Sequence, residues 1–280
     1  MTGLFAPLAR PRIMGVVNVT PDSFSDGGQH ATTDAAIRHG LRLAAEGADI
    51  LDIGGESTRP GATRPVVSEE LDRVVPVIRA LVEEDCVVSV DTMRAEVARA
   101  ALAAGAAIVN DVSGGLADPD ILDVVADSEA SYVAMHWRAH SDRMQDLATY
   151  DQPGGVVAAV RDELGSRLAA ILAAGVPEER VVLDPGLGFA KRGEHNWELL
   201  RALGVVESLG RPLLVGASRK SFLGNVLADP AGAPRPVDER EAAHVALMVL
   251  LAQRGTWGVR VHDVRATVDA FTVWQEMTRA

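Results

Sequence analysis

The 280-residue chain contains a single cysteine, Cys86. A disulfide needs two cysteines, and a structural zinc site commonly takes several, so an internal disulfide and a cysteine-based zinc centre are both excluded. Cys86 lies in the apolar run CVVSV, where a small packing side chain is a more common role than a nucleophile. We therefore expect Cys86 to be a buried packing residue.

Basic residues are fewer than acidic ones, with 27 Lys and Arg against 39 Asp and Glu and a formal net charge of -12. Nucleic acids and anionic membrane surfaces are bound through broad positive potential, so neither is expected as a partner. Any anion that this protein binds must be held locally, by a few cations and backbone N–H groups.

The chain also lacks a long hydrophobic run, although 48% of its residues are hydrophobic and can form a core. The longest apolar stretch with helical spacing, AAHVALMVLLA, is well short of the ~20 residues that cross a bilayer. The first residues, MTGLFAPLARPRIMG, lack the apolar stretch of a signal peptide. We predict a cytoplasmic protein.

Eight short apolar runs recur along the chain and alternate with amphipathic helical stretches. Near-continuous Val, Ile and Leu predict strands buried on both faces, as in a parallel sheet covered by helices. The runs occupy residues 13–19, 48–54, 87–91, 107–111, 131–136, 180–186, 212–218 and 257–263. Strands that alternate with helices form right-handed βαβ units, and eight such units predict a closed (β/α)8 TIM barrel, for which ~250 residues is typical.

The structural alternative is an open, doubly wound sheet. That fold would favour a G-x-G-x-x-G motif after the first strand, and none is present there; GLGF at 186–189 does not match it. The proline-rich stretch 228–240 is interpreted as a surface loop between the last two strands, so residues 1–280 are predicted to form one domain.

Polar side chains gather at the carboxyl ends of the predicted strands, the face on which TIM barrels carry their active sites. They are Asn18, Asp91, Asn110, Asp184, Lys220, Arg260 and His262. One such Asp or Asn is commonly a cap or turn former, and a lone strand histidine such as His136 is commonly a hydrogen-bonded core residue. Seven in one barrel mouth instead predict a polar ligand, because a buried polar group without a partner costs ~1–3 kcal/mol.

The mixture of side chains indicates the chemistry of that ligand. Carboxylates and a carboxamide can bind a flat heterocycle edged with N–H and C=O groups. Lys220, Arg260 and His262 suit a phosphate or diphosphate, and the last two lie on one face of the final strand. Ser221 stands where the next helix should begin, and a helix N-terminus favours an anion. The site is therefore predicted to have a heterocycle end and an anionic end.

Seven motifs, in order between residues 14 and 264, resemble those of the dihydropteroate synthases, the sulfonamide targets of folate synthesis, and most closely the actinobacterial members. They are MGVVNVTPDSFSDGG, DIGGESTRPGA, VSVDTMRAEVARAAL, IVNDVSGG, LDPGLGFAK, LLVGASRKSFLG and GVRVHDV. The resemblance implies a transferase that joins p-aminobenzoate to 7,8-dihydropterin-6-ylmethyl diphosphate and releases 7,8-dihydropteroate and diphosphate. It also implies Mg2+ and a homodimer.

The resemblance implies roles for the residues that match these motifs. The pterin would be bound by Thr58, Asp91, Asn110, Asp184, Phe189 and Lys220. The diphosphate would be bound by Asn18, Arg260 and His262, and Asn18 would also be a magnesium ligand. The p-aminobenzoate would be bound by Phe24, Arg59, Pro60, Lys220 and Ser221. The implied catalytic residues are Asp91, Asp184, Lys220, Asp26 and Arg59.

Two other functions fit part of the pattern. A methyltransferase that passes a folate methyl group to a corrinoid would share the pterin-binding strand ends, but would need neither SRK nor the Arg-x-His pair. A non-catalytic pterin-binding paralogue need not keep ESTRPG, SRKS and VRVHD together. The motifs therefore favour the synthase over both alternatives.

Overall fold

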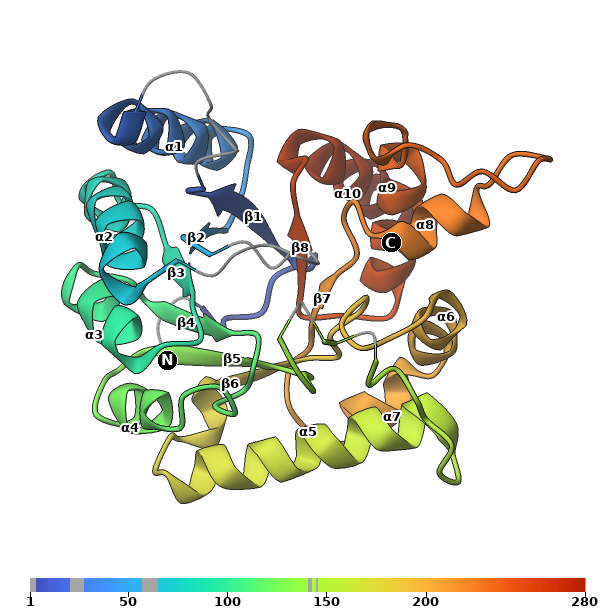
Figure 1. Ribbon diagram of the computed structural model, residues 1–280. Helices are drawn as coiled ribbons and strands as arrows, with labels where there is room; N and C mark the ends of the chain where they lie inside the picture. The colour runs from blue at the N-terminus through green and yellow to red at the C-terminus, as the bar shows by residue number, and fades with distance from the viewer. Residues whose placement is uncertain (1–3, 21–27, 57–64, 141–142, 145, 280) are drawn as a thin grey trace.

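Eight parallel strands form the centre of the molecule, and helices surround them (Figure 1). This computed structural model describes residues 4–20, 28–56, 65–140, 143–144 and 146–279, with the backbone alone for 28–31. The strands are β1 (Arg12–Asn18), β2 (Ile50–Gly54), β3 (Val88–Asp91), β4 (Ile108–Asp111), β5 (Ser131–Met135), β6 (Val181–Asp184), β7 (Leu214–Gly216) and β8 (Gly258–Val261). Each lies within or overlaps one of the predicted runs.

The sheet closes on itself. Its strand order is β6-β5-β4-β3-β2-β1-β8-β7, so only β6 and β7 are left to meet. They meet through a parallel bridge between Leu183 and Leu213, and Leu183 N–H donates to the Pro212 carbonyl at 2.9 Å. The predicted (β/α)8 TIM barrel is therefore confirmed, and the open-sheet alternative is wrong.

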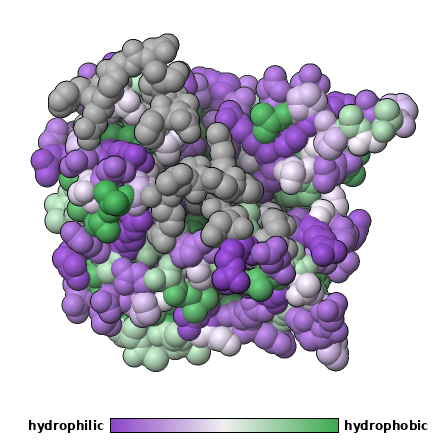
Figure 2. Space-filling view, in the orientation of Figure 1, coloured by the Kyte–Doolittle hydropathy of each residue, from purple (hydrophilic) through white to green (hydrophobic). Residues whose placement is uncertain are grey.

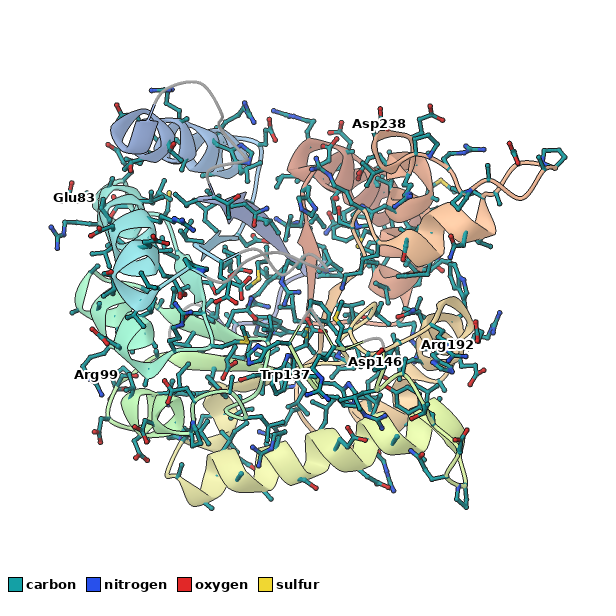
Figure 3. All side chains as sticks on the ribbon, viewed as in Figure 1. Glu83, Arg99, Trp137, Asp146, Arg192 and Asp238 are labelled. Carbon is teal, nitrogen blue, oxygen red and sulfur yellow. The ribbon has the colours of Figure 1, made fainter. Side chains whose placement is uncertain are left out.

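The helices cover the outside of the barrel (Figure 1). They are α1 (Gly28–Ala45), α2 (Val67–Glu83), α3 (Ala95–Ala103), α4 (Asp120–Ala126), α5 (Gly155–Ala173), α6 (Gly193–Arg201), α7 (Leu203–Glu207), α8 (Ser221–Val226), α9 (Glu241–Gln253) and α10 (Val264–Thr278). The helical stretch expected between β6 and β7 divides at Ala202 into α6 and α7, next to Gly204, because glycine is a poor helix former. Charged side chains such as Glu83 and Arg99 point outward from this layer (Figure 3).

The interior of the barrel changes from apolar to polar along its axis. At the amino ends of the strands, a buried cluster fills it: Met14, Ile50, Ile108, Val133, Val182 and Leu214, with Phe5 and Trp257 packed against them. Alternate residues of a strand share a face, so the residue two positions further on also points inward. The pairs are Ile50 and Asp52, Ile108 and Asn110, Val182 and Asp184, and Leu214 and Gly216. The barrel itself thus places polar residues above an apolar floor.

The structure also describes the stretch 228–240, Cys86 and the lengths of the helices, for which the sequence made predictions. The stretch 228–240 is a loop with one turn of 3-10 helix, Val237–Glu239, and it projects from the side of the barrel (Figure 1). Cys86 is half-buried beside the core, and burial raises the pKa of its thiol. Among the described helices, none has the length and apolar character to cross a membrane. That the whole of 1–280 forms one domain stays a prediction.

Candidate functional site

Arg260 reaches from β8 into the polar part of the barrel interior, where its side chain is 13% exposed. Its Nη2 donates to Asp184 Oδ2 at 2.9 Å, and Nε lies 3.4 Å from Asp52 Oδ2 as an ion pair. Asn110 Oδ1 accepts a longer bond from the same Nη2 at 3.4 Å, and Asn110 Nδ2 donates to Asp52 at 2.9 Å. One guanidinium therefore connects β8 with β2, β4 and β6.

Gly216 provides the room for this guanidinium. It pairs with Arg260 on the neighbouring strand β7. A Cβ atom at position 216 would lie 2.8 Å from Arg260 Nη1, a separation that non-bonded atoms do not tolerate. A side chain at this position would displace Arg260 from its carboxylates, so the glycine of LLVGAS is part of the site.

Burial of several carboxyl groups around one cation shifts their pKa values. Burial raises the pKa of Asp52, and Arg260 partly opposes this. The pKa of Asp91 is raised well above its ordinary value, by burial first and then by the nearby charge of Asp52. Burial would lower the pKa of Arg260, but Asp184, Asp52 and Asp91 together raise it. The arginine stays charged, and the raised pKa values of Asp52 and Asp91 favour the protonated form of these two carboxyl groups.

Asn18 and Asp91 end β1 and β3 on either side of Gly54. A Cβ atom built on Gly54 would lie 3.5 Å from Asp91 Oδ2 and 3.9 Å from Asn18 Oδ1. Two oxygens therefore converge over a residue without a side chain. Within the described part of the chain, no group of three or more His, Cys, Asp or Glu side chains is arranged to hold a metal ion.

Lys220 borders the site from the turn before α8. Its ammonium donates to the Leu187 carbonyl and lies 5.1 Å from the ring centroid of Phe189. Burial lowers the pKa of Lys220 to about 8, with Asp184 acting in the opposite direction. Asp184 itself accepts from Gly186 N–H at 2.7 Å. The turn after β6 and the turn after β7 therefore meet at this lysine.

The other predicted residues of β7, α8 and β8 lie at the rim. His262 directly follows β8, and its Nδ1 lies 3.0 Å from Ser218 Oγ. Ser221 is the first residue of α8, as expected, and it is exposed. Predicted residues Phe24, Asp26, Thr58, Arg59 and Pro60 lie outside the described residues.

Sequence reasoning missed Asp52, which is 2% exposed and bonded to the central arginine. The signal was present in ADILDIG, where an acidic residue stands in the middle of an apolar strand. Because Asp52 is two residues after the inward-facing Ile50, it had to face the interior as well. An unpaired buried carboxylate is costly, so this position predicts a buried cation.

Two acidic residues near the site have structural roles. Asp263, a possible rim partner of Arg260 in sequence, instead caps α10 by accepting from Ala266 N–H at 3.0 Å. Asp111 accepts 2.7 Å bonds from the Ser113 and Gly115 N–H groups and from the Tyr132 hydroxyl. Asp111 is thus the turn former that strand-end aspartates commonly are.

Known proteins share both the sequence and this fold. Residues 14–262 match the family described as pterin binding enzyme. The chain is 53% identical to the dihydropteroate synthase of Mycobacterium leprae (strain TN), over 95% of this chain and 93% of that protein. The structure of Xanthomonas albilineans dihydropteroate synthase with 4-aminobenzoic acid matches with a TM-score of 0.87 at 50% identity, covering 97% of this chain and 94% of that one. The Xanthomonas albilineans enzyme in complex with 7,8-dihydropteroate matches with a TM-score of 0.83 at 47% identity, covering 97% and 95%.

The Arg260 cluster predicts how the thermal stability of the protein depends on pH. In an Arg260→Met variant, Asp52, Asp91 and Asp184 lose their shared cation. A carboxyl group whose folded-state pKa is raised binds protons more tightly in the folded state, so stability is lost as the pH rises through that pKa. We expect Arg260→Met to lower the melting temperature most at pH 7–8, and progressively less toward pH 5. Thermal unfolding of both proteins across this range measures the effect, and an equal loss at every pH would contradict it.

Proposed function

The chain belongs to the dihydropteroate synthases, transferases of folate biosynthesis within the pterin-binding enzyme family, and from this premise we propose the roles of its site residues. The observation that carries the assignment is the Arg260 cluster, in which Asp184 and Asn110 bond to the guanidinium and the charges of Asp91 and Lys220 act on it or on Asp184. The corrinoid methyltransferase and the non-catalytic paralogue are not supported by these relatives.

In our proposal the pterin ring lies against Asp91, Asn110, Asp184 and Lys220, with Phe189 at its side and Thr58 nearby. The raised pKa of Asp91 favours a protonated carboxyl group, which can both donate and accept, as a ring edged with N–H groups and nitrogen acceptors requires. Lys220, with a pKa of about 8, donates an N–H bond while it is protonated. Polar partners of both kinds therefore surround the heterocycle.

The diphosphate is proposed to bind at Asn18, Arg260 and His262. Arg260 uses Nη2 for Asp184, whereas its Nη1 lies against Gly216. A guanidinium can therefore bridge the pterin end and the anionic end of the site, because its donors point in different directions. The negative charge on the leaving diphosphate would be stabilised by a cation that is already held in place.

We propose that Mg2+ binds with the diphosphate, with Asn18 as a protein ligand. Magnesium takes oxygen ligands, keeps several waters and usually binds through one or two protein oxygens and substrate phosphates. The convergent oxygens of Asn18 and Asp91 over Gly54 fit such a site. When bound, the ion would neutralise charge on the diphosphate.

The proposed reaction is dissociative. The bond between the pterin methylene carbon and the diphosphate oxygen breaks, and the electron pair leaves with the diphosphate. Asp91 and Asp184 stabilise the delocalised cation left on the pterin. The p-aminobenzoate, bound by Phe24, Arg59, Pro60, Lys220 and Ser221 near Asp26, attacks through its amino nitrogen, which then loses one proton. No protein nucleophile is needed.

A cytoplasmic location and a homodimer are also proposed. The support for the dimer is apolar surface on the neighbouring helices α9 and α10, where Leu250 is 57%, Val273 65% and Met277 81% exposed. The face seen in Figure 2 is largely hydrophilic over its described residues, with scattered hydrophobic side chains. The cytoplasmic location rests on the sequence alone.

The primary test is product formation from the purified chain. With dihydropterin diphosphate, p-aminobenzoate and Mg2+, we expect 7,8-dihydropteroate and an equal amount of diphosphate. Omitting p-aminobenzoate, or adding a chelator, should abolish the product, and excess Mg2+ should restore it. Equal product formation in the chelator would remove magnesium from the proposal. No product under any condition would refute the activity.

Asp184→Asn tests the pterin role. We expect the affinity for 6-hydroxymethyl-7,8-dihydropterin to fall by about 1–3 kcal/mol, the range for a bond to a charged group, with little change for p-aminobenzoate. Calorimetry with each ligand measures both. Asp118→Asn is the matched control, because Asp118 also accepts a backbone N–H at 2.7 Å, from Ala95, away from the site. Equal pterin affinities in the two variants would refute the assignment.

Leu250→Glu tests the dimer. A charge in an apolar interface is strongly unfavourable, so we expect sedimentation velocity to show a dimer for the wild type and a monomer for this variant. Leu172→Glu on α5 places the same charge at another exposed leucine, 38% exposed, and should remain dimeric. A monomeric wild type, or two dimeric variants, would count against α9 as the interface.

A further inference from the structure

Lys191 is a buried amine to which the proposed reaction gives no role. It follows the turn after β6 and is 3% exposed. Its Nζ lies 2.9 Å from the Gly186 carbonyl oxygen, 3.1 Å from the Phe189 carbonyl oxygen and 2.8 Å from Nδ1 of His136. An ammonium has three N–H donors, and these three acceptors use all of them.

His136 connects this ammonium to a carboxylate on α5. The imidazole is 1% exposed, and its Nε2 lies 3.0 Å from Glu163 Oε2. Arg138 binds the same carboxylate through Nε at 3.0 Å and Nη2 at 2.5 Å. An ionised carboxylate only accepts, so Nε2 carries the imidazole proton and Nδ1 presents its lone pair to Lys191.

The protonation states agree with this arrangement. Burial opposes ionisation of Glu163, but bonds from His136 and Arg138 outweigh it and lower the pKa of Glu163 to about 2. Burial and the neighbouring Lys191 lower the pKa of His136 to about 4, so the imidazole is neutral at pH 7. Burial lowers the pKa of Lys191 well below its ordinary value, and the charge of Asp184 acts in the opposite direction.

The two carbonyls that Lys191 holds begin and end the turn 186–189. Gly186 has a φ of +65°, and a Cβ there would lie 2.3 Å from the His136 carbonyl oxygen, so the chain passes directly against β5. Inside the turn, Gly186 N–H binds Asp184, and the Leu187 carbonyl accepts from Lys220. The turn therefore touches two of the residues proposed to hold the pterin, Asp184 and Lys220.

The composition of the chain supports a specific need for lysine here. Only two of the 27 basic residues are lysines, Lys191 and Lys220, and the other 25 are arginines. An ammonium carries its three donors on one atom, whereas a guanidinium spreads its donors over a plane. Three acceptors that converge on one point suit the ammonium alone.

We propose that Lys191, oriented by His136 and Glu163, is a positioning residue of the transferase reaction, because it fixes the Gly186–Phe189 turn against which Asp184 and Lys220 are held. This inference rests on the proposed pterin roles of Asp184 and Lys220. Arg260 and His262 contact the anionic end from β8 and lie outside the turn.

The first experiment compares the affinities of the Lys191→Met variant for two ligands. This substitution keeps the length of the side chain and removes all three N–H donors. Calorimetry should show the affinity for 6-hydroxymethyl-7,8-dihydropterin falling on the order of tenfold, while the affinity for inorganic diphosphate stays unchanged. A purely structural role would lower both affinities with the melting temperature. Lys191→Arg should fail to restore pterin binding, because its donors do not converge.

The second measurement uses the rarity of lysine. With 15N-lysine labelling, the wild type should give two side-chain Nζ signals, one from each lysine. In Lys191→Met the remaining Lys220 signal should shift, since its acceptor Leu187 lies in the turn. An unshifted Lys220 signal together with wild-type pterin affinity would overturn the proposal.

If the Lys191→Met variant does not fold, the Glu163→Gln variant tests the same proposal. It leaves the buried groups in place and removes the charge that sets the imidazole tautomer, so pterin affinity should fall and the Lys220 signal should shift. Glu207→Gln is the matched control: Glu207 is 37% exposed and paired with Arg254, as Glu163 is 39% exposed and paired with Arg138. Identical behaviour of the two variants would refute the proposal. A wild type without synthase activity would instead refute the proposed function, independently of these comparisons.

Discussion

The site depends on one buried cation shared by several carboxyl groups. Arg260 is held by Asp184 and Asp52 and touches Asn110, so three strands are oriented by a side chain from a fourth. Burying a charge is costly unless it is paired, and here each charge makes the burial of the others tolerable. Burial raises the pKa values of Asp52 and Asp91, and the charge of Arg260 partly opposes this rise. In the proposed function, the heterocycle end and the anionic end of the site share this one arginine.

The second support is the turn after β6. Asp184 lies at the end of the strand and accepts a bond from the first N–H of the turn. Lys220 donates to the Leu187 carbonyl inside the turn. Lys191 donates to the carbonyls of Gly186 and Phe189, at the two ends of the turn. His136 and Glu163 extend this network to the surface of α5. The end of the site proposed for the pterin is therefore supported through hydrogen bonds, whereas the residues proposed for the diphosphate come from the ends of β1 and β8.

Glycine has a defined place in this design at two positions. Gly216 leaves space for the guanidinium of Arg260, and Gly54 leaves space between the oxygens of Asn18 and Asp91. In both cases the missing side chain faces the interior. A Cβ at position 216 would lie 2.8 Å from Arg260 Nη1, whereas a Cβ at position 54 would meet the two oxygens at ordinary contact distances of 3.5 and 3.9 Å. Gly216 is therefore the position at which the site itself requires glycine.

The sequence by itself determined the barrel, because the alternation of apolar strands and amphipathic helices can be read from periodicity alone. It also identified the polar strand ends, because parallel strands place all their carboxyl ends on the same face of the barrel. It also located Asp184, Asn110, Lys220 and Arg260 in one mouth. Only the tertiary structure decided which side chains are partners. Arg260 binds Asp184 and Asp52 and not Asp263, which caps α10. Lys191 contacts His136. These partners are far apart in the sequence, and their contact depends on strand register and side-chain length across the closed barrel, which no local pattern encodes.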